Sequence, residues 1–137
     1  MREVFVDTGA FYAALNRRDE HHREAVQLFT RAVEEEWRLV TSNFVVAETH
    51  ALILTRLGRD LATGWLRNVP AEVVRITAED EGKAKRIIFG YRDKEFSYCD
   101  ATSFAVMERM RIRDVMAFDP HFTQYGKFVS ARWQNAR

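Results

Sequence analysis

The chain has 137 residues, 47% of them hydrophobic and 30% charged, which excludes a disordered or fibrous protein and predicts one globular domain over residues 1–137. Its single cysteine, Cys99, excludes an internal disulfide and favours a reducing, cytoplasmic setting, where it is expected to be a small core residue. A net charge of +1 does not by itself indicate nucleic-acid binding, and we expect no membrane association, because there is neither a secretory leader nor an apolar run of the roughly 20 residues that cross a bilayer.

Short β-branched and aromatic runs alternate with helical patterns along the sequence. The runs that predict strands are residues 4–6, 38–41, 72–75, 115–118 and 128–129. Apolar residues spaced three or four apart predict helices over residues 23–36, 44–57, 80–89 and 98–110. Strands that alternate with helices favour a mostly parallel sheet with helices on both faces, so the expected fold class is α/β, a three-layer α/β/α sandwich.

Two acidic residues, Asp7 and Asp119, each follow a predicted strand directly. Ligands of such sheets bind outside the carboxyl ends of the strands, which makes both acids candidates for a binding site. Each also has a local explanation. Asp7 can cap a helix that begins near Thr8, and Asp119 can cap a helix whose first position is Pro120. The two interpretations are compatible, since a capping carboxylate can also face a metal ion.

Glu48 lies on the apolar face of a predicted helix. Its neighbours three and four positions away are Phe44, Val45, Ala51 and Leu52. An ionised carboxylate on an apolar face is costly unless it pairs with a cation or coordinates a metal. Glu48 is therefore expected to point inward, either into a buried ion pair with an arginine or into a metal site.

Asp100 also shares its helix face with apolar residues, Phe104 and Met107. The segment from Ser97 to Asp100 matches a capping box, in which Ser97 caps the helix and the acid reaches back to the Ser97 backbone. Capping and a place in a site are both open for Asp100.

The four acids come from two strand ends and two helices, and such segments can meet in one cleft. Converging carboxylates repel one another unless protons or cations neutralise them. Carboxylate oxygens suit Mg²⁺ or Mn²⁺ and suit zinc poorly, so the expected cofactor is Mg²⁺, with Mn²⁺ as a second choice. A metal held in this way lowers the pKa of an attacking water and holds a phosphate, so phosphodiester hydrolysis is the reaction that fits.

Four segments carry a resemblance to a known family. They are, in order, residues 4–11 (VFVDTGAF), 45–49 (VVAET), 96–107 (FSYCDATSFAVM) and 117–122 (AFDPHF). Through these motifs the sequence resembles the PIN-domain ribonucleases, and specifically the VapC-type toxins of prokaryotic toxin–antitoxin pairs. The segments follow the family's order and span nearly the whole chain.

The resemblance implies a five-stranded parallel sheet, metal-dependent cleavage of RNA, and often a homodimer bound by an antitoxin protein that blocks the site. The acidic metal ligands that it implies are Asp7, Glu48, Asp100 and Asp119. Thr8 and Ser97 match polar positions that support the acidic cluster in relatives. Residues 116–118 depart from the family, because many relatives have a threonine-rich run there, and this leaves the contribution of Asp119 the least defined.

Histidines and tryptophans add little to this prediction. His121, two residues after Asp119, is assigned a minor role with the substrate, and the other three histidines lack the spacing of a zinc site. We expect the three tryptophans to pack in a core or an interface rather than to stack on RNA bases; they are Trp37, Trp65 and Trp133.

Other classes of protein compete with a nuclease. Aspartyl-phosphate phosphatases and receiver domains also carry acids at strand ends, but the phosphatase needs an acid where Gly9 stands, and the adjacent acid pair of the receiver is absent. A non-catalytic PIN-like module that binds RNA or protein stays open. Thermal stability with and without Mg²⁺ or Mn²⁺ distinguishes it, because a ligand that binds only the folded state stabilises that state.

Overall fold

The computed structural model describes residues 1–131, which are built around one sheet of five parallel strands. The strands are β1 (Glu3–Val6), β2 (Arg38–Ser42), β3 (Glu72–Val74), β4 (Asp114–Met116) and β5 (Val129–Ser130), in the spatial order β3-β2-β1-β4-β5. Phe5 of β1 stands opposite Val40 of β2 on one side and Val115 of β4 on the other. The predicted parallel sheet and its five strands are confirmed.

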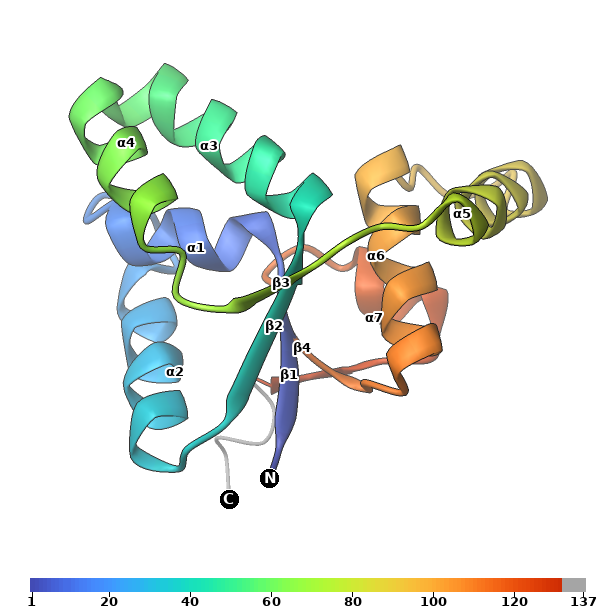
Figure 1. Ribbon diagram of the computed structural model, residues 1–137, viewed down its shortest axis with the longest axis horizontal. Helices are drawn as coiled ribbons and strands as arrows, with labels where there is room; N and C mark the ends of the chain where they lie inside the picture. Colours follow the sequence, from blue (N-terminus) through green and yellow to red (C-terminus); the bar gives the residue numbers. More distant parts are fainter. Residues whose placement is uncertain (132–137) are drawn as a thin grey trace.

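Helices cover both faces of the sheet, which confirms the three-layer arrangement (Figure 1). The first layer contains α1 (Thr8–Leu15), α2 (His22–Glu34), α3 (Asn43–Leu57) and α4 (Arg59–Arg67). The second layer contains α5 (Ala78–Gly90), α6 (Tyr98–Met110) and α7 (His121–Tyr125). From β1 the chain adds β2 and β3 on one side of the sheet, and it then returns past β1 to add β4 and β5 on the other side. Because crossovers are right-handed, the two directions of travel put the two sets of helices on opposite faces.

One predicted strand needs correction, and helix α4 was not predicted. The fourth strand ends at Met116 rather than at residue 118, so it stops short of Asp119. Helix α4 has no predicted counterpart, because it has only nine residues and only Ala62 and Trp65 of it are buried. The other predicted strands and helices agree with the structure to within two residues at each end.

Burial follows the layers. The apolar residues of β1 are fully buried because helices cover both faces of the sheet. Trp37 and Trp65 are buried, as predicted, while Trp133 lies outside the described residues. Within residues 1–131, no helix is both long enough and apolar enough to cross a membrane.

An aromatic cluster packs the second helix layer together. It contains Phe104, Phe122, Tyr125 and Phe128. The rings of Phe104 in α6 and Phe122 in α7 meet edge to face, with centroids 5.0 Å apart. The cluster therefore fixes α6 against α7, the helices that carry Asp100 and His121.

Candidate metal centre

The carboxyl ends of β1 and β4 lie side by side at the point where the strand order changes direction. The backbone amide of Asp7 donates to the carbonyl oxygen of Met116 at 3.0 Å, which joins the two strand ends. The first turns of α1, α3 and α6 lie at this same end of the sheet (Figure 1). Segments that are far apart in the sequence, each with an acidic residue, therefore meet here.

Asp7 follows β1 directly, as predicted, and is only 4% exposed. It is the residue before α1, but its side chain makes no capping hydrogen bond, so capping does not account for it. Burial raises the pKa of the Asp7 carboxyl well above its usual value, and nearby negative charges raise it further. Those charges belong to Asp119, Asp100 and Glu48. The four acids thus influence one another electrostatically, and we refer to them as the acidic cluster. Among the described residues, the tighter group whose ligand atoms lie within 4.8 Å of one another consists of Asp100, Asp119 and His121, without Asp7 or Glu48.

Asp100 is both a capping residue and a member of this cluster. The predicted capping box is present: the Asp100 amide donates to Ser97 Oγ at 3.0 Å, and the Ser97 amide donates to Asp100 Oδ2 at 3.1 Å. Burial raises the pKa of the Asp100 carboxyl and Asp119 adds to the rise, although the Ser97 amide and His121 act in the opposite direction. The capping bonds hold the carboxylate in place at the site.

Asp119 lies in the loop between β4 and α7, and its predicted position needs two corrections. Residues 117 and 118 separate it from the strand. The residue before α7 is Pro120, so Asp119 does not cap the helix in the predicted register and the proline is not its first residue. The reason that the helix starts later than predicted is a turn closed by the Asp119 side chain. Asp119 Oδ1 accepts a hydrogen bond from the His121 amide at 2.9 Å, so His121 is the first residue of the helix.

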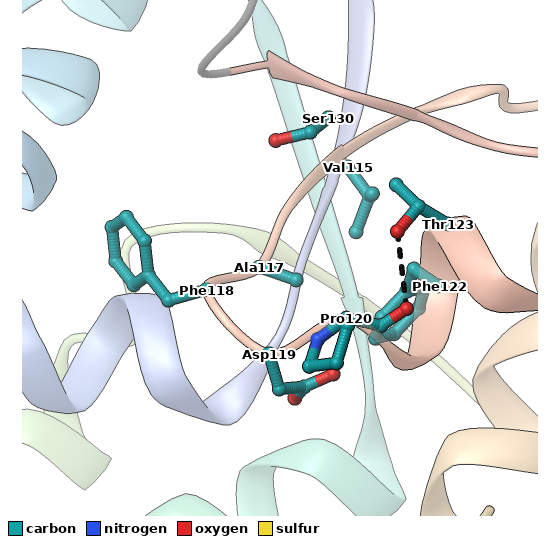
Figure 2. A pocket seen from close by; sticks show the side chains of 8 residues that line it. All are labelled: Val115, Ala117, Phe118, Asp119, Pro120, Phe122, Thr123 and Ser130. Atoms are coloured by element: carbon teal, nitrogen blue, oxygen red, sulfur yellow. Dashed lines mark hydrogen bonds between the residues drawn. The ribbon is translucent and has the colours of Figure 1, made fainter.

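The Asp119 loop borders a small cavity of about 180 Å³, drawn in Figure 2. Side chains of β4, β5 and α7 form its other walls. The ring of Phe118 lies parallel to the ring of His21, with centroids 4.5 Å apart. Sequence reasoning missed this contact, because nothing in the local pattern relates residues so far apart. It ties the Asp119 loop to the segment before α2.

The prediction that Glu48 points inward among apolar side chains is wrong. The buried stripe of α3 consists of Val45, Thr49 and Ile53, and Glu48 is exposed. Successive helix residues are rotated by about 100°, so Glu48 turns outward when Thr49 packs inward. The Glu48 carboxylate still acts on the other acids, because its charge contributes to the raised pKa of Asp7 and to that of the Cys99 thiol.

Thr8 and Ser97, which were expected to support the acids, each form a hydrogen bond next to the site. The buried Thr49 hydroxyl donates to the Thr8 hydroxyl at 3.0 Å, which joins α3 to α1. Thr49 therefore faces α1, and Glu48, the preceding residue, points in another direction. Ser97 fixes Asp100 through the capping box.

Cys99 is half-buried: it packs against the edge of the hydrophobic core and also lies beside the acidic cluster. Burial and the charges of Glu48, Asp7 and Asp100 raise the pKa of its thiol. A thiol held protonated is a poor nucleophile, so the cysteine is not a candidate for covalent chemistry.

His121 lies between two of the acids. Its Nδ1 atom is 2.8 Å from Asp100 Oδ2 and 3.5 Å from Asp119 Oδ1. One ligand atom from each of these three residues can be chosen so that all lie within 4.8 Å of one another. The sequence signal was only that His121 stands two positions after an acid, and it did not reveal the contact with Asp100.

Within residues 1–131, no lysine or arginine forms an ion pair with any of the four acids. The arginine partner that was one alternative for Glu48 is therefore absent from this part of the chain. Negative charge gathered in a partly buried place needs a compensating cation. Carboxylate oxygens are the ligands that Mg²⁺ and Mn²⁺ prefer, so these residues fit a divalent metal centre.

Comparison with known proteins agrees with this geometry. Residues 4–128 match the PIN domain family. The chain is 37% identical over 133 residues to the 23S rRNA-specific endonuclease VapC20 of Mycobacterium tuberculosis, which covers 94% of this chain and 98% of that protein. It is 31% identical over 125 residues to a VapC ribonuclease of Archaeoglobus fulgidus, which covers 88% of this chain and 79% of that protein.

Solved structures share the fold. The crystal structure of VapC20 from M. tuberculosis, described as a sarcin-ricin loop cleaving toxin, has a TM-score of 0.84 and 33% identity, covering 92% of this chain and 96% of that one. A toxin-antitoxin complex from Klebsiella pneumoniae has a TM-score of 0.66 at 16% identity, covering 92% and 95%. The family match over most of the sequence, together with the identity to VapC proteins, shows that this chain belongs to the PIN domain family, as its motifs predicted.

Proposed function

We propose that this protein is a metal-dependent ribonuclease that hydrolyses phosphodiester bonds of RNA. The observation that carries the proposal is the convergence of four carboxylates that have no lysine or arginine partner within the described residues. The relatives support it, because one is a 23S rRNA-specific endonuclease and another a VapC ribonuclease. A non-catalytic PIN-like module is not favoured, since all four acids are retained.

We assign the metal ligands to Asp7, Glu48, Asp100 and Asp119. Asp7 and Asp100 are buried and lie at the inner side of the site, whereas Glu48 and Asp119 are exposed at the side where RNA can approach. A bound divalent ion supplies an attacking water of lowered pKa and neutralises charge on the phosphate. The capping bonds of Asp100 and the turn of Asp119 hold these carboxylates in place before any ion or RNA binds.

Further parts of the function follow from the likeness to VapC-type toxins. We propose that Mg²⁺ is the ion used, with Mn²⁺ able to replace it, and that the protein acts in the cytoplasm. We propose that an antitoxin protein blocks the site and that the chain forms a homodimer. A relative described as a sarcin-ricin loop cleaving toxin makes ribosomal RNA the first substrate to test.

The test is cleavage of ribosomal RNA and messenger RNA by the purified protein with Mg²⁺, Mn²⁺ or EDTA. Asp7→Asn is prepared identically, with Asp60→Asn in α4 as the matched control. We expect cleavage that needs a metal, persists in Asp60→Asn and falls at least about a hundredfold in Asp7→Asn, because the metal contributes several kcal/mol. Cleavage that resists EDTA, or that the two variants support equally, would contradict the proposal.

A further inference from the structure

The His121 ring pairs with two of the four acids, Asp100 and Asp119. Its Nδ1 atom lies 2.8 Å from Asp100 Oδ2 and 3.5 Å from Asp119 Oδ1. Its backbone amide is bound by Asp119, and its ring meets Phe96 edge to face with centroids 5.9 Å apart. The ring is thus held from two sides, with one nitrogen directed between two carboxylates.

We propose that His121 is itself a metal ligand through Nδ1, and that this nitrogen raises the affinity of the site for Mn²⁺ relative to its affinity for Mg²⁺. The inference rests on the proposed metal-dependent function. It adds a fifth donor to the four acids and makes the ring a determinant of which ion is bound.

Ligand spacing supports this assignment. In an octahedral site with bonds of about 2.0–2.1 Å, adjacent ligand atoms are about 3 Å apart. The separations of His121 Nδ1 from the two carboxylate oxygens, 2.8 and 3.5 Å, lie on either side of that value. Asp100, Asp119 and His121 come from α6, the β4–α7 loop and the first position of α7, and the aromatic cluster of the second layer holds these segments together.

The chemistry of the donor explains the expected preference. Mg²⁺ favours oxygen ligands and keeps several waters, whereas imidazole nitrogen favours transition metals. Among the transition metals, Mn²⁺ also accepts carboxylate oxygens readily, so it suits a mixed set of acids and one histidine. A neutral imidazole binds through Nδ1 when its proton is on Nε2.

The experiment uses the full chain with Mn²⁺ and Mg²⁺ as probes. Pulsed electron paramagnetic resonance detects ¹⁴N nuclei bonded to Mn²⁺, and calorimetry gives the affinity for each ion. His121→Phe keeps a ring that can pack on Phe96 but has no nitrogen, and His50→Phe makes the same change in α3 as the control. We expect ¹⁴N coupling in the wild type and in His50→Phe, and its loss in His121→Phe.

Changes in affinity give a second readout. Groups that only support metal ligands already alter metal affinity about 10- to 100-fold, so removal of a direct ligand should weaken Mn²⁺ binding at least about tenfold. Mg²⁺ binding should fall less, so the ratio of Mn²⁺ to Mg²⁺ affinity decreases in His121→Phe and not in His50→Phe.

Two results would overturn the inference: Mn²⁺ bound to the wild type without ¹⁴N coupling, or an unchanged ratio of affinities in His121→Phe. Both leave the proposed nuclease standing as long as the wild type binds Mn²⁺ and cleaves RNA. If the wild type binds no Mn²⁺, the proposed function fails together with the inference. Should His121→Phe not fold, the wild-type spectrum still decides whether a nitrogen is bonded to the ion.

Discussion

Asp7 and Asp100 are acids buried without a lysine or arginine partner in the described chain, at 4% and 8% exposure. Burial raises the pKa of both carboxyls, which means that their ionised forms are unfavourable in the folded, metal-free protein. Glu48 belongs to the same cluster but is exposed, so its charge is largely solvated. The acids therefore differ in what they cost the fold, although all four are assigned to one metal.

The first prediction compares two of these acids. In EDTA at neutral pH, Asp7→Asn should raise the free energy of unfolding, because asparagine keeps the shape of aspartate without a carboxyl whose ionised form is unfavourable at this buried position. Glu48→Gln should change that free energy by no more than about 0.5 kcal/mol, as expected at an exposed position. Thermal unfolding measures both effects, since 1 kcal/mol corresponds to roughly 2–8 °C in Tm for domains of up to about 250 residues. A lower Tm for Asp7→Asn than for the wild type would contradict this account of the site.

The second prediction concerns pH. A carboxyl whose pKa is higher in the folded than in the unfolded state makes the folded protein bind more protons between the two values. The contribution of Asp7 to stability is therefore fully present below about pH 4, the ordinary range of an aspartate, and is lost as the pH rises through the raised pKa.

Urea unfolding of the wild type and Asp7→Asn in EDTA, from pH 4 to pH 8, measures this contribution as a difference. The wild type should lose stability relative to the variant as the pH rises, and saturating Mn²⁺ should abolish the loss. A wild type that gains stability relative to Asp7→Asn over this range would show that the assigned direction of the pKa shift is wrong.

At the scale of elements, α5 and α6 begin with the same local device. Thr77 and Asp80 form a capping box at α5, as Ser97 and Asp100 do at α6. Asp80 then receives two hydrogen bonds from Arg109, which lower its pKa although burial alone would raise it. Among the described residues no lysine or arginine pairs with Asp100, whose side-chain partner is instead the His121 ring. One capping box therefore supports the fold, and the other also supports the site.

The third prediction separates these two roles. Thr77→Ala and Ser97→Ala should each reduce stability by about 1 kcal/mol, because each removes a helix cap. Only Ser97→Ala should also weaken Mn²⁺ binding, by about tenfold or more, since it loosens the carboxylate of Asp100. Thermal unfolding and calorimetry on the same samples measure both quantities. Equal Mn²⁺ affinities in the two variants would remove Ser97 from the support of the site.

Sequence patterns predicted correctly those helices and strands that neighbouring residues alone determine. Residues 98–110 match α6 throughout, because a serine cap and an inward apolar face mark that helix. The strand β4 was predicted too long, since residues 117 and 118 are as apolar as a strand but turn away from the sheet to carry Asp119 to the site. Periodicity misjudged Glu48, because spacing within one helix says nothing of the space left between that helix and α6.

At the scale of the whole molecule, the site depends on topology. The strand order places the end of β1 beside the end of β4, which the sequence suggested through two acids after strands. The contact of His121 with Asp100 was not predictable, because it depends on how α6 and α7 pack through the aromatic cluster. Organisation as one domain over residues 1–137 stays a prediction.

Whether the four acids form one metal centre is tested most directly by calorimetric titration of the metal-free protein with Mn²⁺. The wild type is compared with Asp7→Asn, Asp100→Asn and the control Asp60→Asn. We expect the wild type and the control to bind Mn²⁺ equally, and each of the other two variants to bind it at least about tenfold more weakly. Equal binding by all four proteins, or no binding by the wild type at millimolar Mn²⁺, would contradict the metal centre and the nuclease built on it.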